Sequence, residues 1–263
     1  MATKDIVTLV VSGLAFALSL SSTIITLWQK KFETERALRQ QLTETIGKLN
    51  GVYEQVEKLR QEKLDDWNHP AIISLRSFYN GQKLLYARQA TYLIDQLPKI
   101  ASEVDFNSIA RAFGDNDDDK EAASYFEKAI EASSGRPLYQ AMNFRGYARM
   151  LFRVGRIADG RQAYERAISL VVEKSDSSHW FQAETTQRWA EIEADIGNRE
   201  QAISLLERAY ALYDLIKFPT RRTEGVRNLE SIRKRILTTQ QQIQMSADNT
   251  AVANIIDDGT RRL

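Results

Sequence analysis

Three arginines recur at regular intervals in one segment of the chain, as Arg145, Arg149 and Arg153. Steps of four residues place them on one face of a helix, where like charges repel, so helix stability alone does not account for them. Guanidinium groups bind carboxylates through paired hydrogen bonds, which predicts recognition of an acidic segment or a chain terminus. The competing interpretation is internal pairing with acids of a later helix, Glu184, Glu191 and Asp195.

Other residue types offer little catalytic chemistry. The two histidines, His69 and His179, are interpreted as residues at helix starts, and cysteine is absent, so no histidine triad or thiolate metal site can be assembled. The acidic run Asp115 to Asp119 lacks the later Gly and Glu of a calcium loop and is predicted to cap a helix. The sequence has no phosphate loop, dinucleotide fingerprint or nucleophile elbow. We expect no enzyme activity, cofactor or metal.

The composition indicates an all-α protein. There are 12 Gly and 4 Pro, while Ala, Leu, Glu, Gln and Arg are abundant, as in helices rather than in turn-rich sheets. Lys plus Arg (36) nearly balance Asp plus Glu (35). Since the net charge is only +1, the whole-chain field does not attract nucleic acid, and no nucleic-acid partner is expected.

Three segments of the chain align as an internal repeat. Each has a small residue, a bulky residue four positions later and Ala three positions after that, so that two helices can approach closely. These positions are Ala122, Phe126 and Ala129, then Gly160, Tyr164 and Ala167, then Ala202, Leu206 and Ala209. Five residues before the small position, Gly155 and Gly197 supply the positive φ that a turn between two helices needs.

With an upstream helix before each glycine turn, at Asn143 to Arg153 and Glu184 to Ile196, the chain resembles the tetratricopeptide repeat (TPR) family. The resemblance covers about residues 100–217 and implies an α-solenoid that binds a protein partner. The implied groove is lined by first-helix residues, which we assign as Arg145, Arg149, Arg153 and Gln187. Tyr147 and Trp189 fall at large-residue positions and are predicted to be core.

The match departs from the family pattern in its spacing. Equivalent alanines lie 38 and 42 residues apart, more than the family unit of about 34 residues, and the acidic run stands where the first tight turn belongs. We expect irregular repeats in a domain at 68–246, with a degenerate leading helix pair from Pro70 to Leu97 and a capping helix from Thr220 to Met245. Residues 247–263 are predicted to form a flexible tail.

Residues 29–67 are predicted to form a charged helical stalk. Apolar and small residues keep heptad spacing over about three heptads. They are Leu38, Leu42, Thr45, Leu49, Val52, Val56 and Leu59. A parallel coiled coil, packing against the chain's own repeats and a solvated lone helix all fit this stripe, and Gly47 and Gly51 weaken the first.

An uncharged segment of 23 residues runs from Ile6 to Trp28, after a short tail at 1–5. As a helix it is about 35 Å long, enough for a hydrocarbon core of about 30 Å. Lys30, Lys31 and further basic residues follow it, which predicts a cytoplasmic C-terminal side and an outer N-terminus. We expect a single-pass protein of the plasma or inner membrane.

This segment also carries small and hydroxyl residues in rows along the helix, and such rows permit close contact between membrane helices. The residues assigned to self-association are Ser12, Gly13, Ala17, Ser19, Ser21 and Ser22. The alternative is that the hydroxyls bond to their own helix backbone.

Two functions fit these predictions. The first is a membrane-anchored adaptor or scaffold that binds a cytoplasmic protein through its repeat groove and forms a homodimer or higher homo-oligomer through its span and stalk. The second is a membrane effector whose span oligomerises and perturbs the bilayer when the repeats sense a signal. A regulatory subunit of a larger membrane complex would differ from the adaptor only in having an obligate partner.

Overall fold

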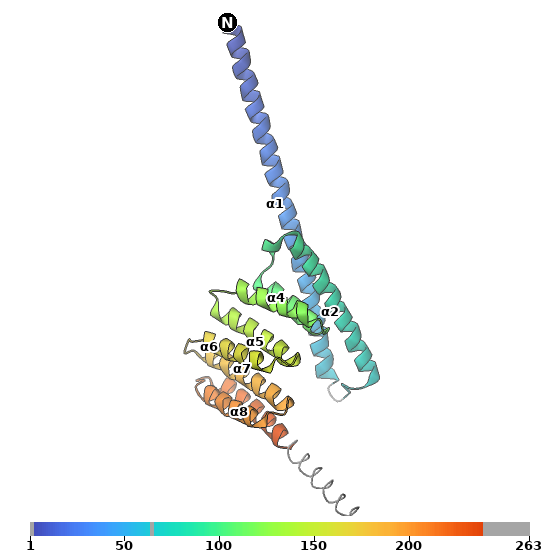
Figure 1. The fold of residues 1–263 in the computed structure, drawn as a ribbon, viewed down its shortest axis with the longest axis vertical. Helices are drawn as coiled ribbons and strands as arrows, with labels where there is room; N and C mark the ends of the chain where they lie inside the picture. Colours follow the sequence, from blue (N-terminus) through green and yellow to red (C-terminus); the bar gives the residue numbers. More distant parts are fainter. Residues whose placement is uncertain (1–2, 64–65, 239–263) are drawn as a thin grey trace, which may run out of the picture. The chain divides into compact units, whose positions relative to one another are not determined.

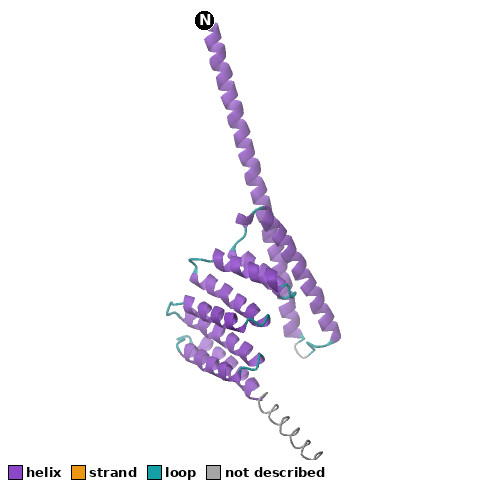
Figure 2. Ribbon diagram, in the orientation of Figure 1, coloured by secondary structure: helices purple, strands orange, loops and turns teal. Residues whose placement is uncertain are grey.

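The computed structural model describes residues 3–63 and 66–238, with side chains from Phe16 on except at position 17. Every regular element of these ranges is a helix (Figures 1 and 2). In chain order they are α1 (Thr3–Glu62), α2 (Pro70–Gln96), the short 3-10 helix η1 (Pro98–Ile100), α3 (Glu103–Gly114), α4 (Asp119–Ala132), α5 (Pro137–Arg153), α6 (Ile157–Leu170), α7 (Asp176–Asp195), α8 (Arg199–Asp214) and helical residues 219–238. The chain divides into two compact units between Tyr125 and Phe126, within α4.

The heptad stripe of α1 packs inside the chain. Its residues Leu42, Leu49 and Val52 are buried, as is the neighbouring Ile46, where α1 lies against α2, α3 and η1. Intramolecular packing is therefore the arrangement seen among the three that the stripe allowed. A parallel coiled coil with a second copy would need side chains that α1 has already covered.

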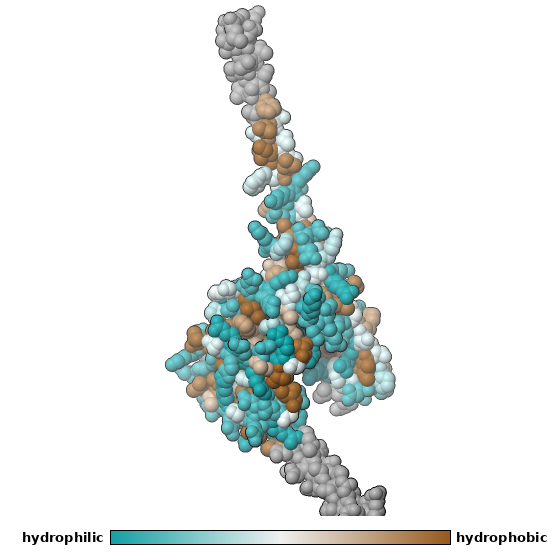
Figure 3. Space-filling view, in the orientation of Figure 1, coloured by the Kyte–Doolittle hydropathy of each residue, from teal (hydrophilic) through white to brown (hydrophobic). Residues whose placement is uncertain are grey.

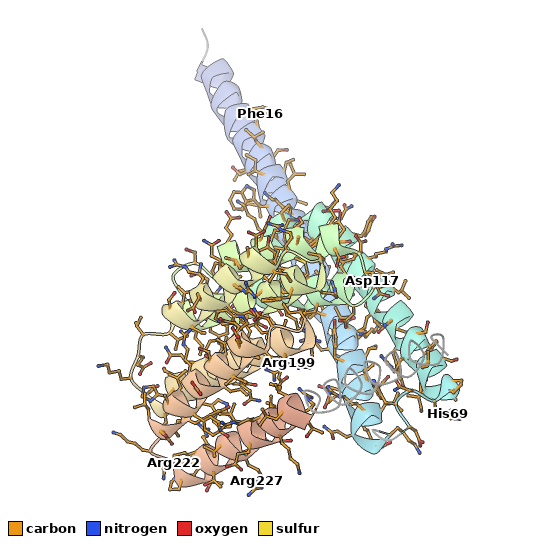
Figure 4. The ribbon with its side chains drawn as sticks, turned by 60° about the horizontal axis from the view of Figure 1, so that its bottom comes forward. Phe16, His69, Asp117, Arg199, Arg222 and Arg227 are labelled. Atoms are coloured by element: carbon orange, nitrogen blue, oxygen red, sulfur yellow. The ribbon has the colours of Figure 1, made fainter. Side chains whose placement is uncertain are left out.

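The segment predicted as a leading helix pair, Pro70 to Leu97, is instead one helix, α2, so that prediction was wrong. His69 lies at its N-cap, where Nδ1 accepts a hydrogen bond from the backbone N–H of Ala71 at 3.3 Å, and Pro70 occupies the first turn (Figure 4). α2 contains no turn and is therefore not itself a helix pair. It packs along α1, and these two helices form a hairpin (Figure 1).

Three turns between helices share one backbone geometry. Gly155 and Gly197 have φ of 78° and 86°, as predicted, and Asp117 takes the equivalent place in the acidic run with φ 59° (Figure 4). In each turn the next residue donates its N–H to a carbonyl five positions back, the pattern that ends many helices. Asp tolerates positive φ better than most residues, so the acidic run makes the same tight turn without glycine.

In the second unit, α5 with α6 and α7 with α8 form two helical hairpins. The small, bulky and Ala positions of all three repeats are buried. Gly160 is needed because a Cβ there would lie 2.6 Å from the Phe152 ring. Helix starts come earlier than predicted, at Pro137 and Asp176 rather than Asn143 and Glu184.

The predicted capping helix, Thr220 to Met245, is helical over 219–238, and its remaining residues lie outside the described ranges, as does the tail at 247–263. Leu229, Ile232 and Ile236 are its buried apolar residues. Gly225 lies against the ring of Tyr213, which brings this helix close to α8. Asp176 accepts hydrogen bonds from the backbone N–H groups of Lys217 and Phe218 at 3.1 and 2.9 Å, just before the helix begins.

In the part of the chain that the structure describes, no helix is both long enough and apolar enough to cross a bilayer. The backbone of the predicted span, Ile6 to Trp28, belongs to α1, but its side chains at positions 6–15 and 17 lie outside the described part, including those of Ser12, Gly13 and Ala17. Ser19, Ser21 and Ser22 are exposed.

Hydroxyl groups in this region of α1 bond to their own helix. Thr23 donates to the carbonyl of Ser19 and Thr26 to that of Ser22, each at 2.9 Å. These two bonds agree with the alternative in which the hydroxyl groups bond to the backbone of their own helix.

Candidate partner-binding face of α5 and α7

Arg145 on α5 is held by α7. Its Nη1 lies 3.1 Å from Oε2 of Glu184, and its guanidinium lies 5.0 Å from the centre of the Phe181 ring. Both partners of the ion pair are partly buried. Arg145 therefore acts as an internal strut between successive repeats, as the pairing alternative predicted.

Glu184 also binds Arg188, one turn later on α7, at 2.8 Å through its other oxygen. Burial raises the pKa of Glu184, but hydrogen bonds and charge from Arg188 and Arg145 outweigh it, so the pKa lies below its usual value. One ionised carboxylate thus bridges two guanidinium groups on neighbouring helices.

Arg149 is different from Arg145. It is exposed and forms no hydrogen bond or ion pair with residues in the described ranges. Its charge acts on Tyr164, as do the charges of Arg145 and Arg188, and all three lower the pKa of that hydroxyl. Burial has the larger effect and raises the pKa of Tyr164 to about 12, so the phenol stays neutral beneath three positive charges.

Arg153 is also exposed, but it already has an interaction partner within the chain. Gln187 is half-buried, and its Oε1 accepts a hydrogen bond from the Tyr213 hydroxyl at 3.1 Å. The four residues assigned to the groove therefore differ in their contacts, and Arg153 is exposed but has a partner within the chain. Arg145 and Gln187 connect helices, whereas Arg149 presents a free guanidinium to solvent.

A buried carboxylate that the sequence reasoning missed lies on α7. Glu193 is fully buried and accepts two 2.7 Å hydrogen bonds from Arg161 of α6. Trp189 and Asn198 donate to it as well, at 2.9 and 3.2 Å. Burial raises the pKa of Glu193, but these donors together lower it below its usual value. Its place among apolar neighbours on α7 was the available sequence signal.

Aromatic and amide side chains complete the packing of this unit. Tyr164 and Trp189 stack in parallel, with ring centres 5.6 Å apart. Tyr147, expected in the core, is only half-buried, because its hydroxyl donates to Glu127 at 3.0 Å. Successive repeats are joined by buried Asn143, which donates to the Ala129 carbonyl at 3.0 Å, and by the equivalent Gln182, which donates to a carbonyl at the end of α6.

The ionisable side chains of this face are arginines and glutamates. Within the described ranges, no group of three or more His, Asp or Glu side chains could hold a metal ion. The face instead offers three guanidinium groups, Arg145, Arg149 and Arg188, near the carboxylates of Glu184 and Glu191. Among these five groups the guanidinium groups outnumber the carboxylates, and Arg149 forms no ion pair with the described residues.

Comparison with known proteins adds little to this geometry. No protein-family model matches the sequence, and no curated protein matches it. Among solved structures, BtubC (BKLC) from P. vanneervenii is similar at 13% identity and a TM-score of 0.40, covering 74% of this chain and 92% of its own. The nearly identical TPR-like repeats of a kinesin-light-chain-like protein from Podosopora anserina are similar at 16% identity and a TM-score of 0.45, covering 75% of this chain and 98% of their own.

Because both TM-scores are below 0.5, we infer no function from these two similar structures. The fold class rests on the helical hairpins, their shared turns and the buried small residues of the structure itself. They define a TPR-like helical-repeat protein, a class consistent with a protein-interaction scaffold.

Proposed function

We propose that the protein is a membrane-anchored adaptor that binds an acidic segment of a partner protein on the α5–α7 face. The observation that carries the proposal is the contrast between Arg145 and Arg149. Arg145 is neutralised by Glu184, while Arg149 is exposed and has no ion pair in the described part of the chain. A carboxylate of the partner would bind the guanidinium of Arg149, while Glu184 holds the neighbouring Arg145 and Arg188 in place.

The anchor in this proposal is the uncharged segment Ile6 to Trp28, with the basic residues that follow it. Lys30, Lys31, Arg36 and Arg39 are exposed, as a flank that stays on the cytoplasmic side would be. The proposal places the repeats in the cytoplasm, the N-terminus outside and the small residues of the span at a contact between copies. Its support is the sequence pattern.

The binding site is tested by fluorescence anisotropy with labelled acidic peptides, half of them with amidated C-termini, and full-length protein in detergent micelles. Arg149→Glu should weaken binding about tenfold, because it replaces a charge-assisted hydrogen bond with repulsion. Arg166→Glu is the matched control, since Arg166 is exposed on α6, away from this face. Equal losses in both variants, or no binding by the unmodified protein, would contradict the proposed site.

The anchor is tested separately by flotation with phosphatidylcholine vesicles. The full-length chain should float with the vesicles, and a variant with Leu14→Arg and Leu18→Arg should remain in the dense fraction, because charges within a span are costly. If both behave alike, the anchor is wrong, and the result leaves the peptide site standing.

A further inference from the structure

The outward side of α2 is apolar. Phe78, Leu85 and Tyr92 are 59%, 54% and 65% exposed and lie seven residues apart. The buried residues of α2 are Lys83, Ala87, Ala90 and Ile94. At about 100° per residue, the exposed trio falls on the side opposite to the buried set. A helix that only packs on α1 needs one apolar face, whereas α2 has two.

A groove runs beside this trio, between α1 and α2. It has a volume of about 500 Å³ and a mixed lining of polar and apolar side chains. We call it the α1–α2 groove, and its lining consists of Gln41, Glu44, Thr45 and Lys48 of α1 and Leu85, Arg88, Gln89, Tyr92 and Leu93 of α2. Hydrophobic residues are visible at the surface over α2 in Figure 3.

The seven-residue spacing of Phe78, Leu85 and Tyr92 along α2 indicates that a helix covers the groove. Seven-residue intervals keep one face turned toward a helix that runs alongside, as in coiled coils. Of the heptad residues of α1, Leu42, Leu49 and Val52 are buried within the chain, whereas Thr45 is half-buried and lines the groove.

We propose that the α1–α2 groove seats the α1–α2 hairpin of a second copy of this chain, so that the two hairpins form a four-helix bundle with twofold symmetry. Two such hairpins are complementary in charge at one level along their length. Glu44 on α1 and Arg88 on α2 are both exposed and line the same groove. Rotation about a twofold axis parallel to the hairpin does not change the height of a residue along that axis. Glu44 of each copy therefore lies beside Arg88 of the other.

The mixed signs in the groove favour a second copy over other helices. Lys48 and Arg88 would repel a basic helix, and Glu44 would repel an acidic one, whereas a second hairpin can pair its Arg88 with Glu44 and its Glu44 with Arg88. In this bundle α1 of one copy also packs against α2 of the other copy. That neighbour is antiparallel to α1, as is α2 of its own chain. The proposal does not rest on the Arg149 site.

Disulfide trapping tests the bundle directly, because the chain has no cysteine of its own. A copy with Thr45→Cys and one tag is mixed in mild detergent with a copy that has Gln89→Cys and another tag, and the mixture is oxidised. Each copy then holds one thiol, so a product with both tags joins α1 of one chain to α2 of the other. We expect this product, and we expect little when Glu54→Cys replaces Thr45→Cys, since Glu54 lies outside the groove.

Charge exchange provides the second test, by sedimentation of the full-length chain. Glu44→Arg and Arg88→Glu should each weaken self-association about tenfold, and the double variant should recover most of it. Glu54→Arg is the control and should change nothing. The proposal is overturned if the double variant associates no better than the single ones, if Glu54→Arg matches them, or if dimers persist without the Thr45–Gln89 product, as contact through the membrane span alone would give.

Discussion

Arg161 and Glu193 meet between α6 and α7 through two hydrogen bonds of 2.7 Å, with the carboxylate fully buried and the guanidinium partly exposed. Trp189 and Asn198 donate to the same carboxylate. Glu193 therefore joins two helices of successive repeats and the turn after α7. It is the polar centre of the second unit.

Removing the charge of Glu193 should destabilise the protein. In Glu193→Gln an amide N–H₂ faces the Arg161 fork, so we expect the free energy of unfolding to fall by about 2 to 4 kcal/mol. Urea denaturation followed by circular dichroism measures this change. Glu207→Gln, on the exposed side of α8, is the control and should alter stability by less than about 0.5 kcal/mol. Similar losses in the two variants would contradict the role of Glu193.

Acid should destabilise the second unit through the same residue. The pKa values of Glu193 and Glu184 are lowered by folding, so their contribution is fully present above the unfolded-state pKa of about 4.3. It is lost as the pH falls through the folded-state values, where both carboxylates become protonated. Urea midpoints measured from pH 7 down to pH 3 should decline for the unmodified chain and decline less steeply for Glu193→Gln. Parallel pH curves would show that Glu193 is not responsible.

The turns should respond oppositely to two substitutions. A Cβ at Gly155 meets no atom within 4 Å, so Gly155→Ala tests the backbone alone and should cost about 1 to 2 kcal/mol, because φ there is 78°. Asp117→Gly should stabilise the chain by up to about 1 kcal/mol, because it relieves positive φ in a non-glycine residue. Thermal melting of the two variants measures both effects. A neutral Gly155→Ala would mean that this turn relaxes.

Close packing of α5 on α6 gives another prediction. In Gly160→Ala the new methyl group would meet the Phe152 ring, which is buried and has little room to move. We expect a cost of about 1 to 3 kcal/mol in unfolding free energy. Gly81→Ala, in open space on α2, should instead stabilise the chain by about 0.5 to 1 kcal/mol. The idea fails if the Gly160 variant melts like the unmodified protein.

The repeat register follows from local chemistry and was therefore predictable. Small residues such as Ala122 and Ala202 are placed where helices touch, and bulky ones such as Tyr164 where they leave space. The turns at Gly155 and Gly197 were predictable because few other residues adopt positive φ. The turn at Asp117 was not, because Asp adopts this geometry only where the surrounding helices require it.

The candidate site was predictable only as a face. Steps of four residues put Arg145 and Arg149 on one side of α5, but the sequence did not distinguish a strut from a free guanidinium. The structure assigns Arg145 to Glu184 and leaves Arg149 exposed. Which acid of α7 meets which arginine depends on how one helix is rotated and shifted against the next, and intrahelical spacing contains no information about that.

By itself, then, the sequence determined the all-α class, the two helical hairpins around Gly155 and Gly197 and the residues at which their helices approach and turn, because these depend on side-chain size and backbone freedom at each position. Only the tertiary structure decided that the heptad residues of α1 pack on its own chain, that Pro70 begins a single long helix and that Glu193 is buried with Arg161. Those outcomes depend on contacts between segments far apart in the chain, where several partners satisfy the same apolar stripe or charge, and the packing of the whole unit selects one.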